Sequence, residues 1–327
     1  MNHGTVTADL AKRLKILRER IDRHDLPSSA LDESLNIATW NIRDFGKKRR
    51  SKEAIHLIAE ILNQFDLIAI AELRDNLTDM RRVMEILGPY WRLVFSDWRP
   101  DRAGNRERSG FLYDKRMVVF TGLAAEADPP RKRGALSGDG DADYEPRYTW
   151  WRSPYMASFS AGHFDFTLLV AHMRWGKSEA ERAVALGNLA DWIDQRRRSK
   201  YVFDKDIIVM GDFNVPKVGD PLYRALTSKG LRMPKALTGV EYTNVAGGKN
   251  YDQILQYSYS EKSFTNRGGI LDFGDHKALF PGMSRADFTY QLSDHFPLWV
   301  QLDTDVEGVY WDRAIKEAGR NGRARAR

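Results

Sequence analysis

The 327-residue chain contains no cysteine. Disulfide bonds, thiolate zinc sites and cysteine nucleophiles are therefore excluded. The chain also lacks an uninterrupted apolar stretch at its start that would resemble a signal peptide, and no segment approaches the ~18 consecutive apolar residues of a membrane span. These absences predict a protein without a membrane span that resides inside the cell, most simply in the cytoplasm.

Histidine is scarce as well, with seven in the whole chain. Two of them end apolar segments within polar motifs, His172 in "LLVAHMRWG" and His295 in "QLSDHFPLW". A lone histidine at the end of a strand is usually structural. Each of these two has a candidate carboxylate, Glu107 or Asp252, that could orient its ring, and an oriented histidine is the common acid or base near neutral pH.

The chain does contain enough apolar material for a large core, with 42% hydrophobic residues that include 15 Phe, 13 Tyr and 9 Trp. Its net charge is +6, but the last eight residues, "RNGRARAR", carry four arginines, and the balance without them is +2. This tail and basic runs such as "KKRRSK" suit a polyanionic partner. The alternative is a solvated basic surface that only aids solubility.

The pattern of the chain divides it into three parts. Residues 1–34 form an N-terminal helical extension and linker, residues 35–302 the main domain, and residues 303–327 a C-terminal helix and the arginine-rich tail. The first helix could dock on the core or mediate dimerisation, and the tail could contact nucleic acid or be dispensable. The apolar residues at helical spacing in the extension are Leu10, Leu14, Leu17 and Ile21.

Strands and helices alternate along the main domain, as is typical of layered α/β or α+β domains whose helices flank sheets. Residues 124–148 have no period and predict a long surface loop. Amphipathic spacing predicts helices at 52–65, 78–88 and 178–198 and a helical turn that begins at Pro221. Apolar runs predict strands at 35–40, 66–73, 91–95, 110–113, 117–120, 155–160, 164–173, 206–213, 251–255 and 296–302.

Three of these strands end in oxygen-bearing side chains. The run "IIVMGDFNVP" leads into Asp212 and Asn214, which point to the same side if the segment is extended, as residues i and i+2 do. Glu72 ends "DLIAIAEL", and Asn41 follows the first strand. Each residue alone is explained by an ordinary strand-to-turn junction. Together they predict hard oxygen ligands, which suit Mg²⁺, Mn²⁺ or Ca²⁺.

A set of short motifs in a fixed order resembles the endonuclease/exonuclease/phosphatase superfamily. The motifs are "WNIRDFG", "AELRDN", "RER", "WRSP", "AHMRWG", "GDFN", "YDQI" and "SDHFP". The resemblance spans residues 35–302, which would be the catalytic domain. It implies an α+β fold, a four-layered α/β/β/α sandwich of two mixed β-sheets flanked by helices. Within the superfamily the chain is most similar to pancreatic-type deoxyribonucleases, because "NIRDFG" and "ELRD" place arginines beside the metal-site residues.

The resemblance also implies a role for each matching residue. The metal site would comprise Glu72 as principal ligand, with Asn41, Asp212 and Asp294. The catalytic set would comprise His295 tuned by Asp252 as general base, His172 paired with Glu107 as general acid or transition-state donor, and Asp212 and Asn214, which orient phosphate, water or metal. Substrate contacts would come from Arg43, Arg74, Arg152 and Asn214.

The function implied by this resemblance is that of a divalent-metal-dependent phosphodiesterase. It would be a DNA endonuclease that uses Mg²⁺, with Mn²⁺ or Ca²⁺ as alternatives, and that leaves 5′-phosphate and 3′-hydroxyl ends. A second hypothesis keeps the site but changes the substrate to a phospholipid or a small phosphate ester. A third is a non-catalytic nucleic-acid-binding protein on the same fold. In the first and third cases the partner is nucleic acid, most simply DNA.

Overall fold

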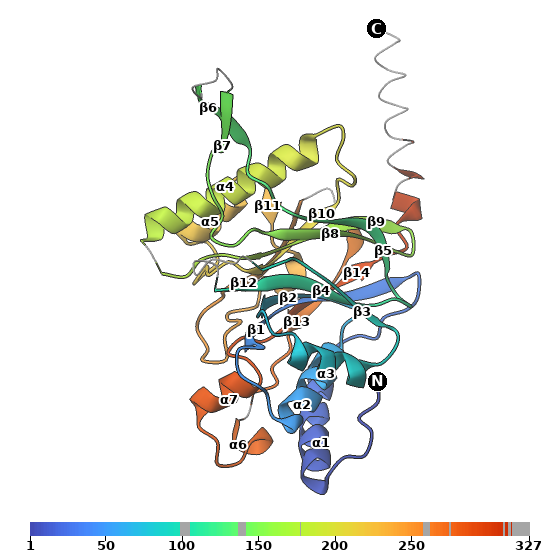
Figure 1. The fold of residues 1–327 in the computed structure, drawn as a ribbon. Coiled ribbons are helices and arrows are strands. Elements are labelled where there is room, and N and C mark those ends of the chain that lie inside the picture. Colours follow the sequence, from blue (N-terminus) through green and yellow to red (C-terminus); the bar gives the residue numbers. More distant parts are fainter. Residues whose placement is uncertain are drawn as a thin grey trace.

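The computed structural model describes residues 1–98, 105–136, 142–176, 178–257, 262–274, 276–309, 311–312 and 315. Within these residues two six-stranded sheets pack face to face, with helices on both outer sides (Figure 1). In spatial order the first sheet consists of β13 (Phe264–Ile270), β14 (Leu298–Asp303), β1 (Ser34–Phe45), β2 (Leu67–Leu73), β4 (Arg108–Asp114) and β3 (Trp91–Phe95). The second consists of β11 (Leu231–Arg232), β12 (Asp252–Tyr257), β10 (Ile207–Asp212), β9 (Phe164–His172), β8 (Tyr155–Ala161) and β5 (Val119–Glu126).

Helices complete the outer layers. Both sheets are mixed, because β1 and β2 are parallel and β9 and β10 are parallel, whereas the other strand pairs are antiparallel. The predicted four-layered α+β sandwich is confirmed. The first sheet is covered by α1 (Ala8–Asp22), α2 (Lys52–Leu62), α3 (Thr78–Leu87), α6 (His276–Leu279) and α7 (Arg285–Gln291) (Figure 1). The second sheet is covered by α4 (Glu179–Arg198) and α5 (Pro221–Thr227). A short 3₁₀ helix, η1, spans Lys235–Leu237.

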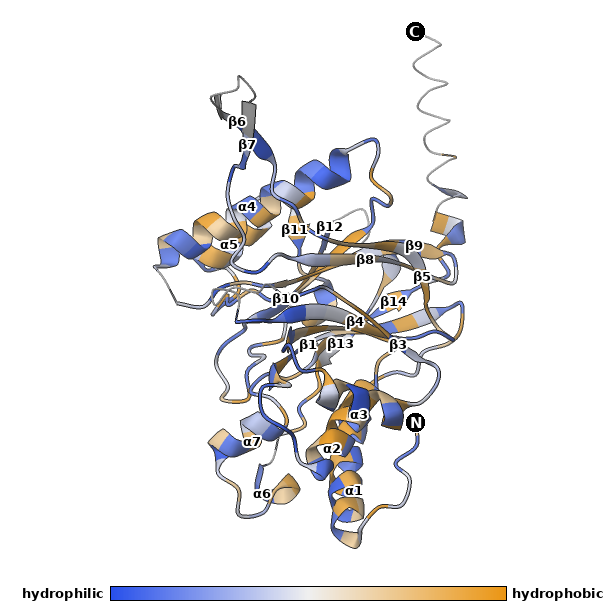
Figure 2. Cartoon of the chain, in the orientation of Figure 1, coloured by the Kyte–Doolittle hydropathy of each residue, from blue (hydrophilic) through white to orange (hydrophobic). Residues whose placement is uncertain are grey.

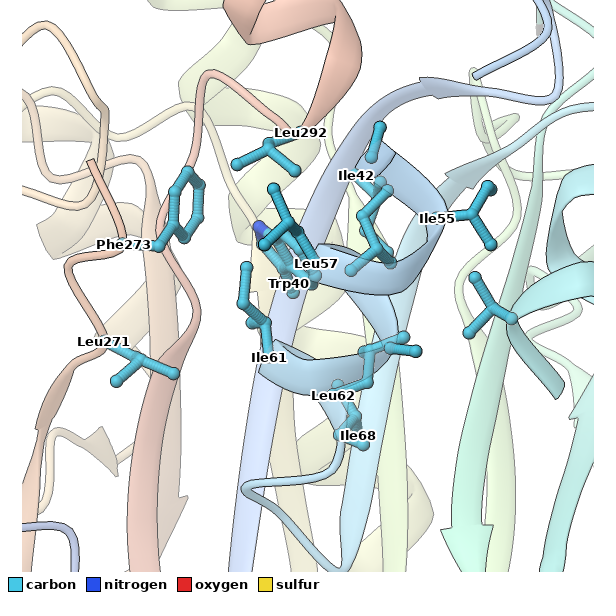
Figure 3. Close-up of a cluster of buried hydrophobic side chains, with 14 of the residues drawn as sticks. Trp40, Ile42, Ile55, Leu57, Ile61, Leu62, Ile68, Leu271, Phe273 and Leu292 are labelled. Atoms are coloured by element: carbon cyan, nitrogen blue, oxygen red, sulfur yellow. The ribbon is translucent and has the colours of Figure 1, made fainter. Parts of the chain in front are cut away.

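The central strands are buried on both faces, as their near-continuous apolar runs predict. On β1, Leu35 and Ile37 belong to the core between the sheets, whereas Trp40 and Ile42 pack with α2 (Figure 3). On β10, Ile208 and Met210 face the other sheet. Further along the same inner faces the residues become polar, with Thr39 and Asn41 on β1 and Asp212 on β10. The functional site forms at this polar end of the two strands.

Helix α2 is the most apolar of the covering helices and is orange along most of its length in Figure 2. Ser51 caps its N-terminus by accepting a hydrogen bond from the backbone N–H of Ala54 at 3.1 Å. All residues from Ala54 to Leu62 are buried, because α1 covers the side of α2 that faces away from the sheet. Among the described helices, none is long and apolar enough to cross a bilayer.

Helix α1 docks on the core, which is one of the two alternatives expected for the N-terminal extension. Its four predicted apolar residues are all buried, and Leu17 is 0% exposed. The segment is also held by polar contacts that the sequence did not suggest. His3 Nε2 lies 2.7 Å from Glu60 Oε2, His3 Nδ1 lies 2.8 Å from His56 Nδ1, and Arg18 Nε donates to Glu60 Oε1 at 2.6 Å.

The predicted loop at residues 124–148 is wrong. Strand β5 continues to Glu126, and β6 (Arg131–Leu136) pairs with β7 (Ala142–Pro146) in a hairpin that projects beside α4 (Figure 1). These strands are short and polar, "RKRGAL" and "ADYEP", so they lack the apolar alternation that marks a strand packed on a core. Strand β13 and helices α6 and α7 also went unpredicted. The arginine tail at 320–327 lies outside the described residues.

Replacing the central leucine of α1 tests whether this helix is part of the fold. Leu17→Ala should lower the free energy of unfolding by about 3 kcal/mol, because it empties a fully buried site. Urea titration followed by circular dichroism measures this loss, with the exposed Lys15→Ala on the same helix as control. An unchanged global midpoint for Leu17→Ala would show that α1 is an independent appendage.

Candidate active site

Three polar side chains stand in one row across the second sheet. In the strand register Asp212 of β10 pairs with His172 of β9 on one side and with Asp252 of β12 on the other. His172 and Asp212 follow, and Asp252 precedes, at even spacing, apolar residues of the same strand that face the other sheet, so all three project on the same inner face. The carboxyl ends of β9 and β10 and the amino end of the antiparallel β12 therefore form a polar cluster at the edge of the hydrophobic interior.

The glycine in "IIVMGDFNVP" allows this row to form. Gly211 has φ +133°, and a Cβ at this position would lie 2.1 Å from the backbone oxygen of Ala171 on β9. Only glycine lets β10 approach β9 this closely and bring Asp212 next to His172.

His295 lies on the Asp252 side of the row. Its Nδ1 is 2.7 Å from Asp252 Oδ2, and its Nε2 is 3.8 Å from Asp212 Oδ2. The backbone oxygen of His295 accepts from Trp40 Nε1 at 2.8 Å, and its N–H donates to Ser293 Oγ at 3.1 Å. His295 is 8% exposed, so its position is set by buried partners from both sheets.

His172 is held in a similar way on the opposite side. Its Nδ1 is 2.9 Å from Glu107 Oε2, and its Nε2 is 3.7 Å from Asp212 Oδ2. Arg152 Nη2 donates to Glu107 Oε1 at 2.9 Å, and Arg74 Nη1 lies 3.4 Å from the same oxygen. Both histidines thus turn Nδ1 to a carboxylate and Nε2 toward one oxygen of Asp212.

Glu72 reaches the cluster through a break in β2. Ile68 and Ile70 of this strand face the helices, so a regular strand would aim Glu72 away from the inner face. Instead Glu72 has φ +61°, and the register of β2 against β4 shifts between Ile70 and Leu73. This irregularity turns the carboxylate to Asn41, whose Nδ2 donates to Glu72 Oε1 at 2.9 Å and to Asp212 Oδ2 at 3.0 Å.

The oxygen-rich corner has the donor chemistry that a hard divalent cation requires. The side-chain oxygen of Asn41 is buried and has no hydrogen-bond partner among the described residues. Glu72 and Asp212 supply carboxylates beside it. Over the described ranges no cluster of three or more His, Cys, Asp or Glu has metal-ligand geometry. Mg²⁺ needs no such cluster, since it is commonly bound through one or two carboxylates together with water and phosphate.

The charges of the cluster shift several pKa values. Burial raises the pKa of Glu107, but His172 and Arg152 outweigh it and hold that pKa at about 2. Burial lowers the pKa of His172, and Arg152 acts in the same direction, yet Glu107 and Asp212 raise it overall. For His295 the lowering by burial is outweighed by Asp252, and the pKa lies well above its usual value.

The remaining predicted residues lie around this centre. Strand β10 ends at Asp212, and Asn214 has a left-handed backbone with φ +52°, so the extended segment expected from Asp212 to Asn214 is not formed. Asn214 Nδ2 donates to Met173 O at 2.8 Å. Asp294 is at the rim, with Oδ2 3.9 Å from Arg43 Nε. A cavity of about 470 Å³ brings together Glu72, Glu107, His172 and Asp294 with Arg43, Arg74 and Arg152.

Some residues of the site were not singled out from the sequence. Asp44 N–H donates to Glu72 Oε2 at 2.6 Å, and Asp44 Oδ1 lies 3.2 Å from Arg74 Nη1. Tyr290 carries the guanidinium of Arg43 over its ring at 4.1 Å. Asp44 lies in the "WNIRDFG" motif, so the sequence marked its segment as part of the site. Tyr290 lies on α7, a helix that the sequence did not predict.

Residues 38–295 match the Endonuclease/Exonuclease/phosphatase family. The chain belongs to this family and is accordingly a hydrolase of the phosphodiesterase or phosphatase type, acting on phosphoester bonds. It is 22% identical over 314 residues to the human "Endonuclease/exonuclease/phosphatase family domain-containing protein 1", an alignment that covers 88% of this chain and 52% of the relative. The chain thus spans about half the length of the curated relatives it matches.

Solved structures share the fold at low identity. The catalytic domain of human Nocturnin, with bound sulfate, has a TM-score of 0.54 and 13% identity over 84% of this chain and 96% of that one. The mannosyl-6-phosphatase of Bacteroides thetaiotaomicron has a TM-score of 0.50 and 19% identity over 82% of this chain and 99% of that one. None of these three relatives is named as a pancreatic-type deoxyribonuclease, so they do not confirm that finer resemblance.

Removing the charge of Glu107 should destabilise the protein at neutral pH. Because its folded pKa of about 2 lies below the unfolded value of 4.5, the carboxylate stabilises the fold above pH 4.5, and the effect is lost as the pH falls toward 2. Glu107→Gln should therefore cost about 3 kcal/mol at pH 7.

Urea unfolding of Glu107→Gln and wild type across this pH range measures the difference. The exposed Glu85→Gln serves as control. A loss that does not diminish below pH 4.5 would mean that lost packing, rather than the charge of Glu107, causes the destabilisation.

Proposed function

We propose that this protein is a divalent-metal-dependent DNA endonuclease that hydrolyses the phosphodiester backbone to 5′-phosphate and 3′-hydroxyl ends. The observation that carries the proposal is the pair of buried histidines, each hydrogen-bonded to its own carboxylate and each turned toward Asp212 Oδ2, at 3.7 and 3.8 Å. Two such rings on opposite sides of one centre suit a reaction that removes a proton from one oxygen and donates a proton to another.

In this proposal His295 takes the proton of the attacking water through Nε2. Asp252 accepts a hydrogen bond from Nδ1–H of the same ring and stabilises the imidazolium that forms. His172, with Glu107 at its Nδ1, donates from Nε2 to the leaving 3′ oxygen or to the charge that develops in the transition state. Asn214 and Asp212 orient the phosphate and the water between the two rings.

In this proposal Glu72 and Asn41 would hold the metal, with Asp212 next to them and Asp294 contributing from the rim of the cavity. Mg²⁺ is the first choice, and Mn²⁺ or Ca²⁺ can satisfy the same oxygen donors. A bound divalent cation would withdraw charge from a phosphate oxygen and offset the carboxylates that raise the pKa of both histidines.

The choice of DNA is supported by the arginines around the central cavity. Arg43, Arg74 and Arg152 all line it, and each is paired with an acidic residue or stacked on an aromatic ring, so its position is fixed before a phosphate binds. Guanidinium groups bind phosphate oxygens in a bidentate way.

A cytoplasmic location is part of the same proposal.

A second candidate is hydrolysis of a phospholipid or a small phosphate ester. The same three arginines could hold a phosphate monoester, and the fold neighbour from Bacteroides thetaiotaomicron is named a mannosyl-6-phosphatase. A protein that only binds nucleic acid would have little need for two histidines with dedicated carboxylates, so we rank it last.

Nicking of supercoiled plasmid tests the first candidate. Wild type with Mg²⁺ or Mn²⁺ should convert supercoiled to open-circular DNA. His172→Ala and His295→Ala should each lower the rate at least 100-fold, because each removes a proton-transfer group. The matched control is the exposed His163→Ala, which lies in the turn between β8 and β9.

Two results would contradict this function. One is the absence of nicking by wild type with every divalent metal, and the other is full activity in both histidine variants. Faster turnover of phosphatidylinositol phosphates or sugar phosphates than of DNA would favour the second candidate.

Metal binding is tested without a substrate. Mg²⁺ or Mn²⁺ should raise the melting temperature of wild type, since a ligand that binds only the folded state stabilises it. Glu72→Gln should lose most of this increase, whereas Asp75→Asn, three residues along and paired with the exposed Arg106, should retain it. Equal increases in all three proteins would place the cation elsewhere.

A further inference from the structure

A second cavity of about 630 Å³ lies beside the central one. It is lined by the segment before β8, with Trp150 and Trp151, and by α4, with Val184 and Leu186. Phe213, directly after Asp212, also lines it. We call this cavity the side pocket.

The side pocket shares lining residues with the central cavity on the His172 side. Trp151, Arg152, His172 and Arg174 line both the side pocket and the central cavity. His295 lines neither of them and borders a separate cavity of about 330 Å³. A group that enters the side pocket therefore approaches the reacting phosphate from the His172 side.

The apolar part of the side pocket suits a flat ring, and Arg152, Arg174 and Arg182 line the pocket beside it. Trp150, Leu186 and Phe213 are at most 4% exposed and present apolar surface. The guanidinium of Arg174 lies 3.6 Å from the ring centroid of Trp151, which fixes both planes. The acidic residue of the lining, Glu181, is engaged with Ser178 at the start of α4.

Nucleobases bind to such surfaces by stacking on aromatic rings and guanidinium planes. A base within a duplex is already stacked and paired, so only an unstacked base can enter a cavity of this kind. The charged sugar-phosphate chain would remain among the arginines of the central cavity.

We propose that the side pocket binds one unstacked base, that of the nucleoside on the 5′ side of the scissile phosphate, which departs with the 3′ hydroxyl. The inference rests on the proposed nuclease function, in which His172 stands beside the leaving oxygen. It makes unpaired or single-stranded DNA the preferred substrate and Trp151 a residue that determines specificity.

Short single-stranded oligonucleotides with one cleavable phosphate, all others being methylphosphonates, test this inference. The nucleoside on the 5′ side carries thymine or is an abasic tetrahydrofuran analogue, and a third substrate has the abasic analogue on the 3′ side. In wild type the 5′ abasic substrate should have a kcat/KM about tenfold lower, a stacking-sized effect, whereas the 3′ abasic substrate should change less.

Two variants assign the preference to the side pocket. Trp151→Ala removes the stacking wall, and Val184→Trp narrows the pocket from a position that is 64% exposed, where a larger side chain does not disturb the core. Both should bring the ratio of kcat/KM between the thymine and 5′ abasic substrates close to one. Tyr201→Ala, an exposed aromatic outside the pocket, should keep the wild-type ratio.

The outcomes separate this inference from the function on which it rests. If wild type cuts both substrates equally well, or if both pocket variants keep the wild-type ratio, the base-binding role is wrong and the nuclease function stands. If wild type cuts neither these substrates nor supercoiled plasmid, the nuclease function is wrong and the inference fails with it.

Discussion

The arrangement of the whole site depends on the buried carboxylate of Asp212. It is 3% exposed, lies at the end of a strand whose other residues are apolar, and has the Nε2 atoms of His172 and His295 within 3.8 Å of one oxygen. A buried carboxylate is costly unless it is paired. The approach of two histidines and the amide of Asn41 meets that requirement, and it brings residues from both sheets to one point. The stability of this corner and its proposed chemistry therefore have the same physical cause.

Apolar runs in the strands and amphipathic spacing in the helices predicted sheets sandwiched between helices, and the four-layered arrangement was implied by the family resemblance. Helix α4 matches its prediction, since Ser178 and Glu181 form the expected capping box. Prediction failed where structure does not depend on an apolar pattern. The hairpin of β6 and β7 is polar, and β13, "FTNRGGI", contains two glycines and little apolar alternation. The polar strand β6 pairs with the polar strand β7, and β13 pairs with β14, which is distant in the sequence. Neither pairing leaves an apolar pattern within the strand itself.

The polar residues of the site were visible as strand ends, but their arrangement was not. Which residues stand side by side is fixed by the register of β9, β10 and β12, and register does not follow from one strand's sequence. Glu72 shows the limit most clearly, because regular alternation would turn it toward the helices and only its left-handed backbone brings it to Asn41. Trp151 lies in a connecting segment before β8, and hydrophobic periodicity does not predict the position of side chains in such segments. It gives the side pocket its planar surface beside His172.

The central claim is that Asp212 gathers both histidines around a single phosphate. The most direct test is nuclear magnetic resonance of the histidine ring nitrogens during titration with inorganic phosphate in the presence of Mg²⁺. The Nε2 signals of His172 and His295 should shift together along one binding curve, and the Nδ1 signals should stay close to their positions because Glu107 and Asp252 hold them. A shift of only one of the two Nε2 signals, or of neither, would contradict the account.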